Sequence, residues 1–296
     1  MSSGTQVRGR RPPHGEPVLD RAFRILGAFG PAHRTLSLTS LSVRAGLPKA
    51  TTLRLARKLV EWGALERTED GEYTVGLRLL EIASLAPRGH GLRATALPYL
   101  EDLHHATGQH ALLAVRDGHE AVLVERLSAR GAGRVLYRVG GRMPLPSTGV
   151  GLVLLAHAPL SVQDEVLARP APWPDRALAR PIPCPDRALA RPIPWPDRAL
   201  AGYVPGPDLD LRARLATVRH DGVAIMSRPR PEPMTSVACP ITDQSRAGQS
   251  RAGAQRSVVA AVSVITRSEE IEPAVLTPAV IAVARAISRA LSAAPQ

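Results

Sequence analysis

The 296-residue sequence contains few of the residues that metal centres and base-stacking surfaces need. Its two cysteines, Cys184 and Cys239, are too few for a zinc cluster and suit a reducing compartment. Aromatic residues make up 3% of the chain, which argues against a protein that binds single strands by stacking bases on aromatic rings. Any core must therefore consist mainly of leucine, valine and alanine.

Long apolar runs and export signals are also scarce. The longest apolar stretch, residues 149–160, is too short to span a bilayer and contains His157. Near the N-terminus, the basic pair Arg10 and Arg11 is followed by a polar segment, whereas an export signal needs an apolar run at that place. We therefore expect a cytoplasmic protein without a membrane segment.

The chain is strongly basic. Lysine and arginine number 38 against 26 acidic residues, which gives a formal net charge of +12, and half of this excess falls within residues 1–90. A basic excess of this size favours a polyanionic partner, most often nucleic acid. The length fits two domains, and the 44% of hydrophobic residues can supply ordinary cores.

The first half of the chain shows the pattern of a winged helix-turn-helix. A helical period runs from Val18 until Gly30 and Pro31 end it, and Ser37 then caps a short helix over residues 38–45. Gly46 ends that helix, and Pro48 suits the first turn of a third one. A hairpin with Asp-Gly at its turn follows over residues 64–75.

The second half has the pattern of an α+β domain with antiparallel strands and helices at both ends. A helix over residues 77–85, which breaks near Pro87, connects it to the first half. The expected helices cover residues 92–106, 148–156, 162–167, 209–218 and 278–291. The expected strands cover residues 110–115, 121–127, 135–139, 223–226, 236–241 and 258–265.

The resulting domain boundaries follow the changes in pattern. They are a disordered basic arm at 1–15, the winged helix-turn-helix at 16–76, a linker helix at 77–91 and the α+β domain at 92–296, with an insertion at 168–211. The insertion is an 11-residue repeat that begins at Ala168, in which Cys184 takes the place of a tryptophan in the neighbouring copies. We interpret the repeat as a tandem duplication outside the fold, because its units lack an apolar face for stacking, and a small proline-rich array is the alternative. Residues 244–253 hold a second short duplication.

The helix that begins after Pro48 carries the main functional signal. On a helical wheel, one half is apolar and includes Thr52, Leu55 and Trp62. The opposite half holds Ala50, Thr51, Arg54, Arg57, Lys58 and Glu61, with Lys49 at the boundary. Arginine can form two hydrogen bonds to a guanine edge, while lysine and threonine can contact phosphate. The alternative is a merely solvated basic face, but the preceding helix and the following hairpin favour a recognition helix, with Arg44 and Arg67 adding DNA-backbone contacts.

These residues resemble the IclR (isocitrate lyase regulator) family of bacterial transcription factors. Residues 47–55 (LPKATTLRL) are similar to the recognition-helix motif of that family, and residues 71–76 (GEYTVG) to its wing-to-linker segment. Residues 139–145, 148–151, 154–156, 211–222, 237–240 and 260–263 resemble its later motifs. The resemblance implies a GAF-like C-terminal domain, a small-molecule effector that modulates binding to double-stranded operator DNA, and a dimer or tetramer that acts as a repressor.

The resemblance also implies an effector pocket. By position it would include Gly149 and Val150 at a helix N-terminus together with Met226, Ser236 and Ser263. Free amides at a helix N-terminus suit a carboxylate, although Gly149 could instead serve close packing and the serines could be merely tolerated in strands. Pro146 and Leu152 replace the family's usual histidine and lysine. The acidic cluster expected after the strand near Gly222 is absent, so the effector cannot be named from the sequence.

Two other functions remain as alternatives. A nonspecific nucleic-acid-coating protein would spread its charge evenly and bind DNA without regard to sequence. An enzyme could use Cys239 or the pair His104 and His105, but no base, glycine-rich elbow or metal-ligand spacing accompanies them. Neither a phosphate-binding loop nor a dinucleotide fingerprint occurs, so we expect no catalytic residues, cofactor or metal.

Overall fold

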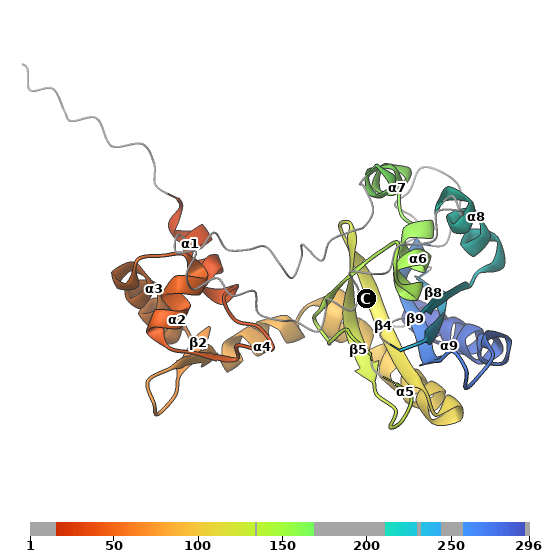
Figure 1. Ribbon diagram of the computed structural model, residues 1–296, viewed down its shortest axis with the longest axis horizontal. Helices are drawn as coiled ribbons and strands as arrows, with labels where there is room; N and C mark the ends of the chain where they lie inside the picture. The colour runs from red at the N-terminus through yellow and green to blue at the C-terminus, as the bar shows by residue number, and fades with distance from the viewer. Residues whose placement is uncertain (1–15, 134, 169–210, 230–231, 244–256, 294–296) are drawn as a thin grey trace, which may run out of the picture. The chain divides into compact units, whose positions relative to one another are not determined.

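The computed structural model describes residues 16–133, 135–168, 211–229, 232–243 and 257–293 (Figure 1). The described residues form two compact units that divide between Ala83 and Ser84. The predicted basic arm, nearly all of the 11-residue repeat and the short duplication at 244–253 lie outside these ranges.

The N-terminal unit has four helices and a small sheet. Its elements are α1 (Val18–Leu26), β1 (Thr35–Leu36), α2 (Leu38–Ala45), α3 (Lys49–Trp62), β2 (Leu65–Arg67), β3 (Tyr73–Val75) and α4 (Leu77–Ser84). The sheet has the antiparallel order β1-β3-β2, so β3 lies in its centre. This is a winged helix-turn-helix, in which the β2–β3 hairpin forms the wing. The predicted fold of this half is confirmed.

A small apolar core holds the first three helices of this unit together. Ile25, Leu41 and Ala56 are fully buried, and Tyr73 of β3 closes the core from the side of the sheet. The predicted wheel of α3 is correct for Thr52 and Leu55, which are buried.

The wheel is wrong for Trp62, whose exposed fraction is 45%. Trp62 is the last residue of α3, where the helix has passed the core. The guanidinium of Arg78 covers its ring instead, with the carbon of that group 4.9 Å from the ring centroid.

The C-terminal unit is built on a six-stranded antiparallel sheet. Its helices are the π-helical turn η1 (Pro87–Gly91), α5 (Leu92–Thr107), α6 (Gly149–Ala156), α7 (Leu160–Leu167), α8 (Leu211–Asp221) and α9 (Pro273–Ala293). Its strands are β4 (His110–Asp117), β5 (Glu120–Leu127), β6 (Arg142–Pro144), β7 (Ala224–Arg228), β8 (Met234–Asp243) and β9 (Ser257–Arg267). The strand order is β6-β5-β4-β9-β8-β7. The α+β fold class with an antiparallel sheet is confirmed.

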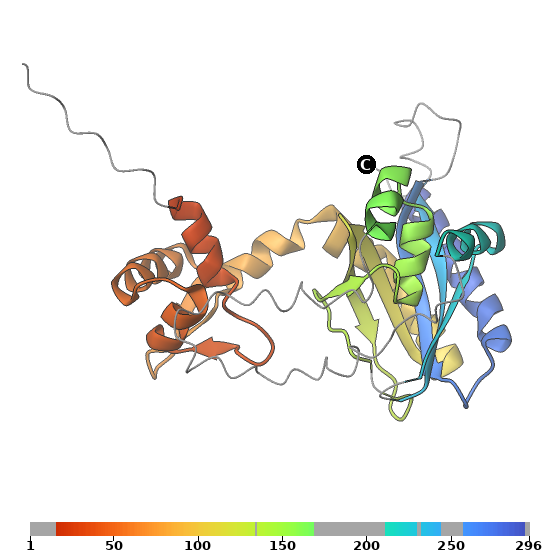
Figure 2. The same ribbon diagram turned by 45° about the horizontal axis from the view of Figure 1, so that its top comes forward.

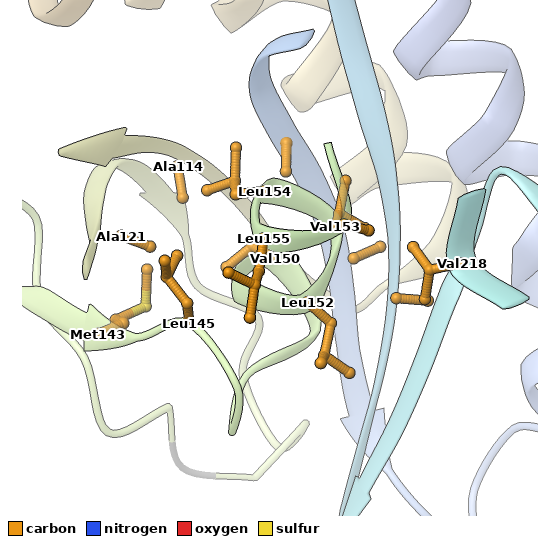
Figure 3. Packing of buried hydrophobic residues seen from close by; sticks show 14 of the residues in the cluster. Ala114, Ala121, Met143, Leu145, Val150, Leu152, Val153, Leu154, Leu155 and Val218 are labelled. Carbon is orange, nitrogen blue, oxygen red and sulfur yellow. The ribbon is translucent and has the colours of Figure 1, made fainter. Parts of the chain in front are cut away.

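Helices cover both faces of this sheet (Figures 1 and 2). Helices α5 and α9 pack on one face over a cluster that includes Leu100, Val262 and Ile287. Helix α6 packs on the other face, with α8 beside it. All eight residues of α6 are buried, and Figure 3 shows its side chains among those of the strands and of Val218.

One predicted strand is wrong. Residues 135–139 carry an apolar pattern, yet they form no strand, and the edge strand β6 lies further along at Arg142–Pro144. Backbone hydrogen bonds of Leu123 go to Gly140 and Gly141 instead. Val135 and Tyr137 are apolar because they cover a pocket, as described below. The predicted break at Pro87 is a π-helical turn that leads directly into α5.

Helix α9 is long and apolar enough to cross a membrane by length and composition, and is alone in this among the helices that the structure describes. It packs on the sheet through Leu276, Val280, Ala284 and Ile287, which are buried. The core helix of a soluble protein meets the same two criteria, although only 22% of the apolar window of α9 is buried.

The burial of α6 predicts a large cost for shortening one of its side chains. Leu155→Ala should lower the free energy of unfolding of the C-terminal unit by about 2–5 kcal/mol, because the residue is fully buried and leaves a cavity. Leu160→Ala, whose side chain is 70% exposed at the start of α7, serves as the matched control and should cost at most about 0.5 kcal/mol. Urea unfolding followed by circular dichroism measures both, and equal losses would contradict the packing of α6.

Candidate functional site

A glycine and two side-chain hydrogen bonds fix the turn between α2 and α3. Gly46 ends α2 with a φ of 59°, a left-handed conformation that favours glycine. Ser42 donates its hydroxyl to the carbonyl of Leu47 at 2.6 Å, and Arg24 of α1 donates to the carbonyl of Gly46 at 2.9 Å. The angle at which α3 leaves α2 is therefore fixed by hydrogen bonds as well as by the core.

The outward side of α3 is exposed and positively charged. Lys49, Arg54 and Arg57 are exposed, and none of them forms a hydrogen bond or ion pair with the residues that the structure describes. Lys58 is exposed too, but its ammonium contacts the carboxylate of Glu61 at 2.6 Å. Free guanidinium and ammonium groups on one helical face are the donors that a DNA groove requires.

The other predicted DNA contacts fall in different surroundings. Arg44 is half-buried, burial lowers its pKa, and its Nε donates to the carbonyl of Ala28 at 2.8 Å. Arg44 thus serves the packing of α2 and is a weaker candidate for a DNA contact. Arg67 is exposed at the base of the wing, where its Nε donates to the carbonyl of Gly71 at 3.1 Å. Ala50 is exposed and Thr51 half-buried on the first turn of α3.

The C-terminal unit contains a pocket between the N-terminus of α6 and the strands. The volume of the pocket is about 70 Å³. This is several times the roughly 10–15 Å³ that one water molecule needs on the same measure. Gly149, Val150, Met226, Ser236 and Ser263 all line this pocket. The structure therefore brings together the five residues that the family resemblance singled out, which come from α6, β7, β8 and β9.

The first turn of α6 approaches the sheet closely. A Cβ atom on Gly149 would overlap the hydroxyl of Ser236, and one on Gly151 would overlap the carbonyl of Leu145. Thr148 caps the helix by accepting from the amide of Gly151 at 3.1 Å. The amides of Gly149 and Val150 have no acceptor within the helix because they belong to its first turn. Both residues line the pocket.

The rest of the lining is mostly apolar and was not predicted from the sequence. The additional residues are Leu112, Val135, Leu136, Tyr137, Met143, Ser147, Thr148, Arg228, Met234 and Ile265. A signal for one of them exists in the sequence. Arg228 follows the buried Ala224 and Met226 at a spacing of two, so strand alternation places it on the same face of the sheet.

Two polar groups of this pocket lack partners among the residues that the structure describes. The hydroxyl of Ser263 is buried with no hydrogen-bond partner, and so is the Nε of Arg228. Burial lowers the pKa of Arg228, while the charges of Tyr137 and Glu232 act in the opposite direction. Buried polar groups are almost always satisfied in proteins, and such an exception needs an explanation.

His110 anchors the segment that leads to the pocket. Its Nε2 lies 2.9 Å from the carbonyl of Gly133, and its Nδ1 accepts from the amide of Ala129 at 3.1 Å. This pattern requires the neutral imidazole, with the proton on Nε2. Burial lowers the pKa of His110, as do the charges of Arg126 and His104, against bonds to backbone carbonyls that raise it.

The groups behind the enzyme alternative are poorly placed for chemistry. Cys239 is buried in β8, and its burial raises the pKa of its thiol to about 12, so the nucleophilic thiolate does not form near neutral pH. His104 hydrogen-bonds the carbonyl of Gln109. The described residues hold no group of three or more side chains that could bind a metal ion.

Two family models match the chain, in the order of the two units. The IclR helix-turn-helix domain matches residues 18–69, and the C-terminal domain of the bacterial transcriptional regulator IclR matches residues 86–173. Each of the two units thus matches a domain of the IclR family. The second match ends shortly after the 11-residue repeat begins at Ala168.

Curated IclR-family proteins align with about half of the chain. The HTH-type transcriptional regulator XynR of Escherichia coli is 32% identical over 139 residues, which cover 47% of this chain and 55% of XynR. The transcriptional repressor IclR of the same organism is 28% identical over 142 residues, which cover 47% of this chain and 52% of that repressor. The aligned part thus spans little more than half the length of these relatives. They are transcriptional regulators, a class that is generally not enzymatic.

Solved IclR-family structures align with nearly the whole chain. An IclR homologue from Microbacterium hydrocarbonoxydans, complexed with 4-hydroxybenzoate, has a TM-score of 0.70 and 28% identity, and the alignment covers 94% of this chain and all of that one. The Thermotoga maritima IclR shares the fold, with a TM-score of 0.64 at 22% identity, over 93% of this chain and 98% of that one.

The state of His110 predicts a pH dependence of stability. Because the folded-state pKa lies below the ordinary 6.5, the unfolded chain binds the proton more readily. The stability that neutral His110 contributes is thus fully present above pH 6.5 and is lost as the pH falls through the lowered pKa. The free-energy difference between the wild type and His110→Gln should therefore shrink between pH 7.5 and 5.5. Urea titrations at both pH values measure it, and a constant difference would refute this role.

Proposed function

We propose that this protein is a DNA-binding transcriptional regulator, acting as a repressor, whose affinity for its operator is modulated by a small molecule in the C-terminal unit. The observation that carries the proposal is the face of α3 with Lys49, Arg54 and Arg57 exposed and unpaired among the described residues. A helix of this kind, following the fixed α2–α3 turn, suits the major groove, while the wing with Arg67 suits the adjacent backbone. Lys58 and Thr51 supply further phosphate contacts.

Self-association of the N-terminal unit is part of the proposal. Helix α4 has no buried residue, and Leu77, Leu80 and Ile82 are between 48% and 68% exposed. Leu19 and Phe23 of α1 are equally exposed. Apolar side chains gathered on two short helices indicate a protein interface. A dimer built there would present two copies of α3 to successive major grooves of a near-palindromic operator.

The small-molecule partner is proposed from the pocket and from a relative. The pocket has an apolar lining, free helix amides and unsatisfied polar groups, which suit an organic acid. The similar Microbacterium protein is complexed with 4-hydroxybenzoate, which makes this acid the first compound to test here. Coupling between such a site and DNA affinity is typically 1–3 kcal/mol. A regulator of this kind acts in the cytoplasm and needs no catalytic activity.

The exposed face of α3 predicts the effect of removing one arginine. Arg54→Ala should cost about 1–3 kcal/mol of operator binding, and the loss should fall at one base-pair position if the side chain reads a base. Fluorescence anisotropy with operator variants at 150 mM salt measures the profile. Arg289→Ala, which removes an exposed arginine from α9, is the matched control and should leave operator affinity within about twofold.

Three results would change the proposal in different ways. A uniform loss over all DNA sequences demotes Arg54 to a phosphate contact. Equal affinity of the wild type for operator and random DNA favours the nonspecific alternative. An Arg54→Ala variant that binds the operator as well as the wild type removes α3 from the interface altogether.

The apolar surface of α4 predicts a weakened dimer on mutation. Leu80→Glu should raise the dissociation constant of the dimer at least about tenfold, because it places a charge where apolar area is buried on association. Analytical ultracentrifugation checks this. Glu81→Gln on the same helix is the control and should leave the association state unchanged. An unaltered dimer in Leu80→Glu would place the interface elsewhere.

A further inference from the structure

Arg228 is a cation in the wall of the pocket that is unpaired among the residues that the structure describes. It lines the pocket, it is partly buried, and it forms no hydrogen bond or ion pair with a described residue, its Nε being fully buried without a partner. Arg142 of the same unit, in contrast, is paired with Asp117 and Glu120. The negative charge of Glu232 acts on the guanidinium, but the two side chains form no ion pair. A partly buried guanidinium without a paired anion is costly. Such a group is retained most simply when a ligand supplies the anion.

The position of Arg228 in the sheet separates it from Ser263. Arg228 pairs with Met234 across β7 and β8, whereas Ser263 of β9 lies in the row of Ala238 and Ala224, two strands across and four residues along. With about 4.8 Å between strands and 3.3 Å per residue, the two Cα atoms are about 16 Å apart. The residues that carry the unsatisfied guanidinium and the unsatisfied hydroxyl are therefore well separated along the pocket wall.

The surface between these two residues is apolar. Met226 and Met234 are buried between them, and Leu112 and Ile265 come from the neighbouring strands. Tyr137 lies close enough to Arg228 for its charge to act on the guanidinium. The pocket thus offers a cation at one place, an apolar middle and a hydrogen-bonding hydroxyl beside the first turn of α6 at another.

We infer that Arg228 is the anion-recognising residue of this pocket, and that the ligand is an elongated monocarboxylate with an apolar body whose far end carries a hydrogen-bonding group for Ser263. This deepens the proposed function, on which it rests for the assumption that the pocket receives an effector. The acidic cluster expected here from the family resemblance would repel such a carboxylate. Its replacement by the segment containing Arg228 reverses the charge preference of the site.

Calorimetry without DNA tests the inference, with 4-hydroxybenzoate and its neutral isostere 4-hydroxybenzamide as probes. The wild type should bind the acid at least about tenfold more tightly than the amide, since a charge-assisted pair replaces a neutral contact. Arg228→Gln should abolish this preference, because it should lower the affinity for the acid and leave the affinity for the amide unchanged. Arg267→Gln, on strand β9 of the same sheet but outside the pocket, is the matched control and should keep the preference.

Three further variants extend the test, and the first of them separates it from a loss of folding. Arg228→Met should have a ligand-free thermal midpoint equal to or above that of the wild type, because it removes an unpartnered cation from the pocket wall. Arg228→Lys should retain part of the preference for the acid. Ser263→Ala should weaken 4-hydroxybenzoate while leaving benzoate, which lacks the far hydroxyl, unchanged.

Several outcomes would overturn the inference. The first is that Arg228→Gln leaves the affinity for the acid unchanged. The second is that the wild type binds neither probe at millimolar concentration. The third is that Ser263→Ala lowers the affinities for 4-hydroxybenzoate and benzoate equally. Operator binding without any Arg228-dependent anion binding defeats this inference alone. Anion binding that depends on Arg228, without specific operator binding, defeats the proposed function alone.

Discussion

The packing of the N-terminal unit depends on the two sides of α3. Its cations must stay in water on one side, and its apolar groups must be buried on the other. An unpaired guanidinium cannot enter a core without a large desolvation cost, whereas Leu55 and Ala56 gain free energy by doing so. The helix therefore packs in one rotational setting, with Arg54 and Arg57 outward. Gly46 and the hydrogen bonds around the turn then fix its angle to α2.

In the C-terminal unit, by contrast, polar groups lie on a face that is otherwise apolar and buried. Helix α6 is buried completely on one face of its sheet, and the start of that helix and side chains that alternate along the strands bring polar groups into that face. Ser263 and Arg228 are there without partners among the described residues. Groups that lower the stability of the empty protein are expected where a ligand binds.

Much of this fold could be predicted because its signals are local. Ser37, Gly46 and Pro48 mark the ends of α2 and α3, and the Asp-Gly turn marks the wing. The helical wheel failed at Trp62 because an angle on a wheel does not say where the core ends along the helix axis. The strand assigned to residues 135–139 failed because an apolar pattern is the same whether it pairs with a strand or covers a pocket. Arg228 was not predicted to line the pocket, because a charged residue at the end of a strand is expected to be solvated as long as its neighbours are unknown.

Protection of DNA by the wild-type protein is the most direct test of the central claim, that α3 reads a defined site. The assay is footprinting on DNA that flanks the protein's own gene, at 150 mM salt and with excess random DNA. The account predicts two protected half-sites whose centres lie about one helical turn, or a whole number of turns, apart. Protection that disappears with the competitor, or that covers all fragments alike, would contradict it.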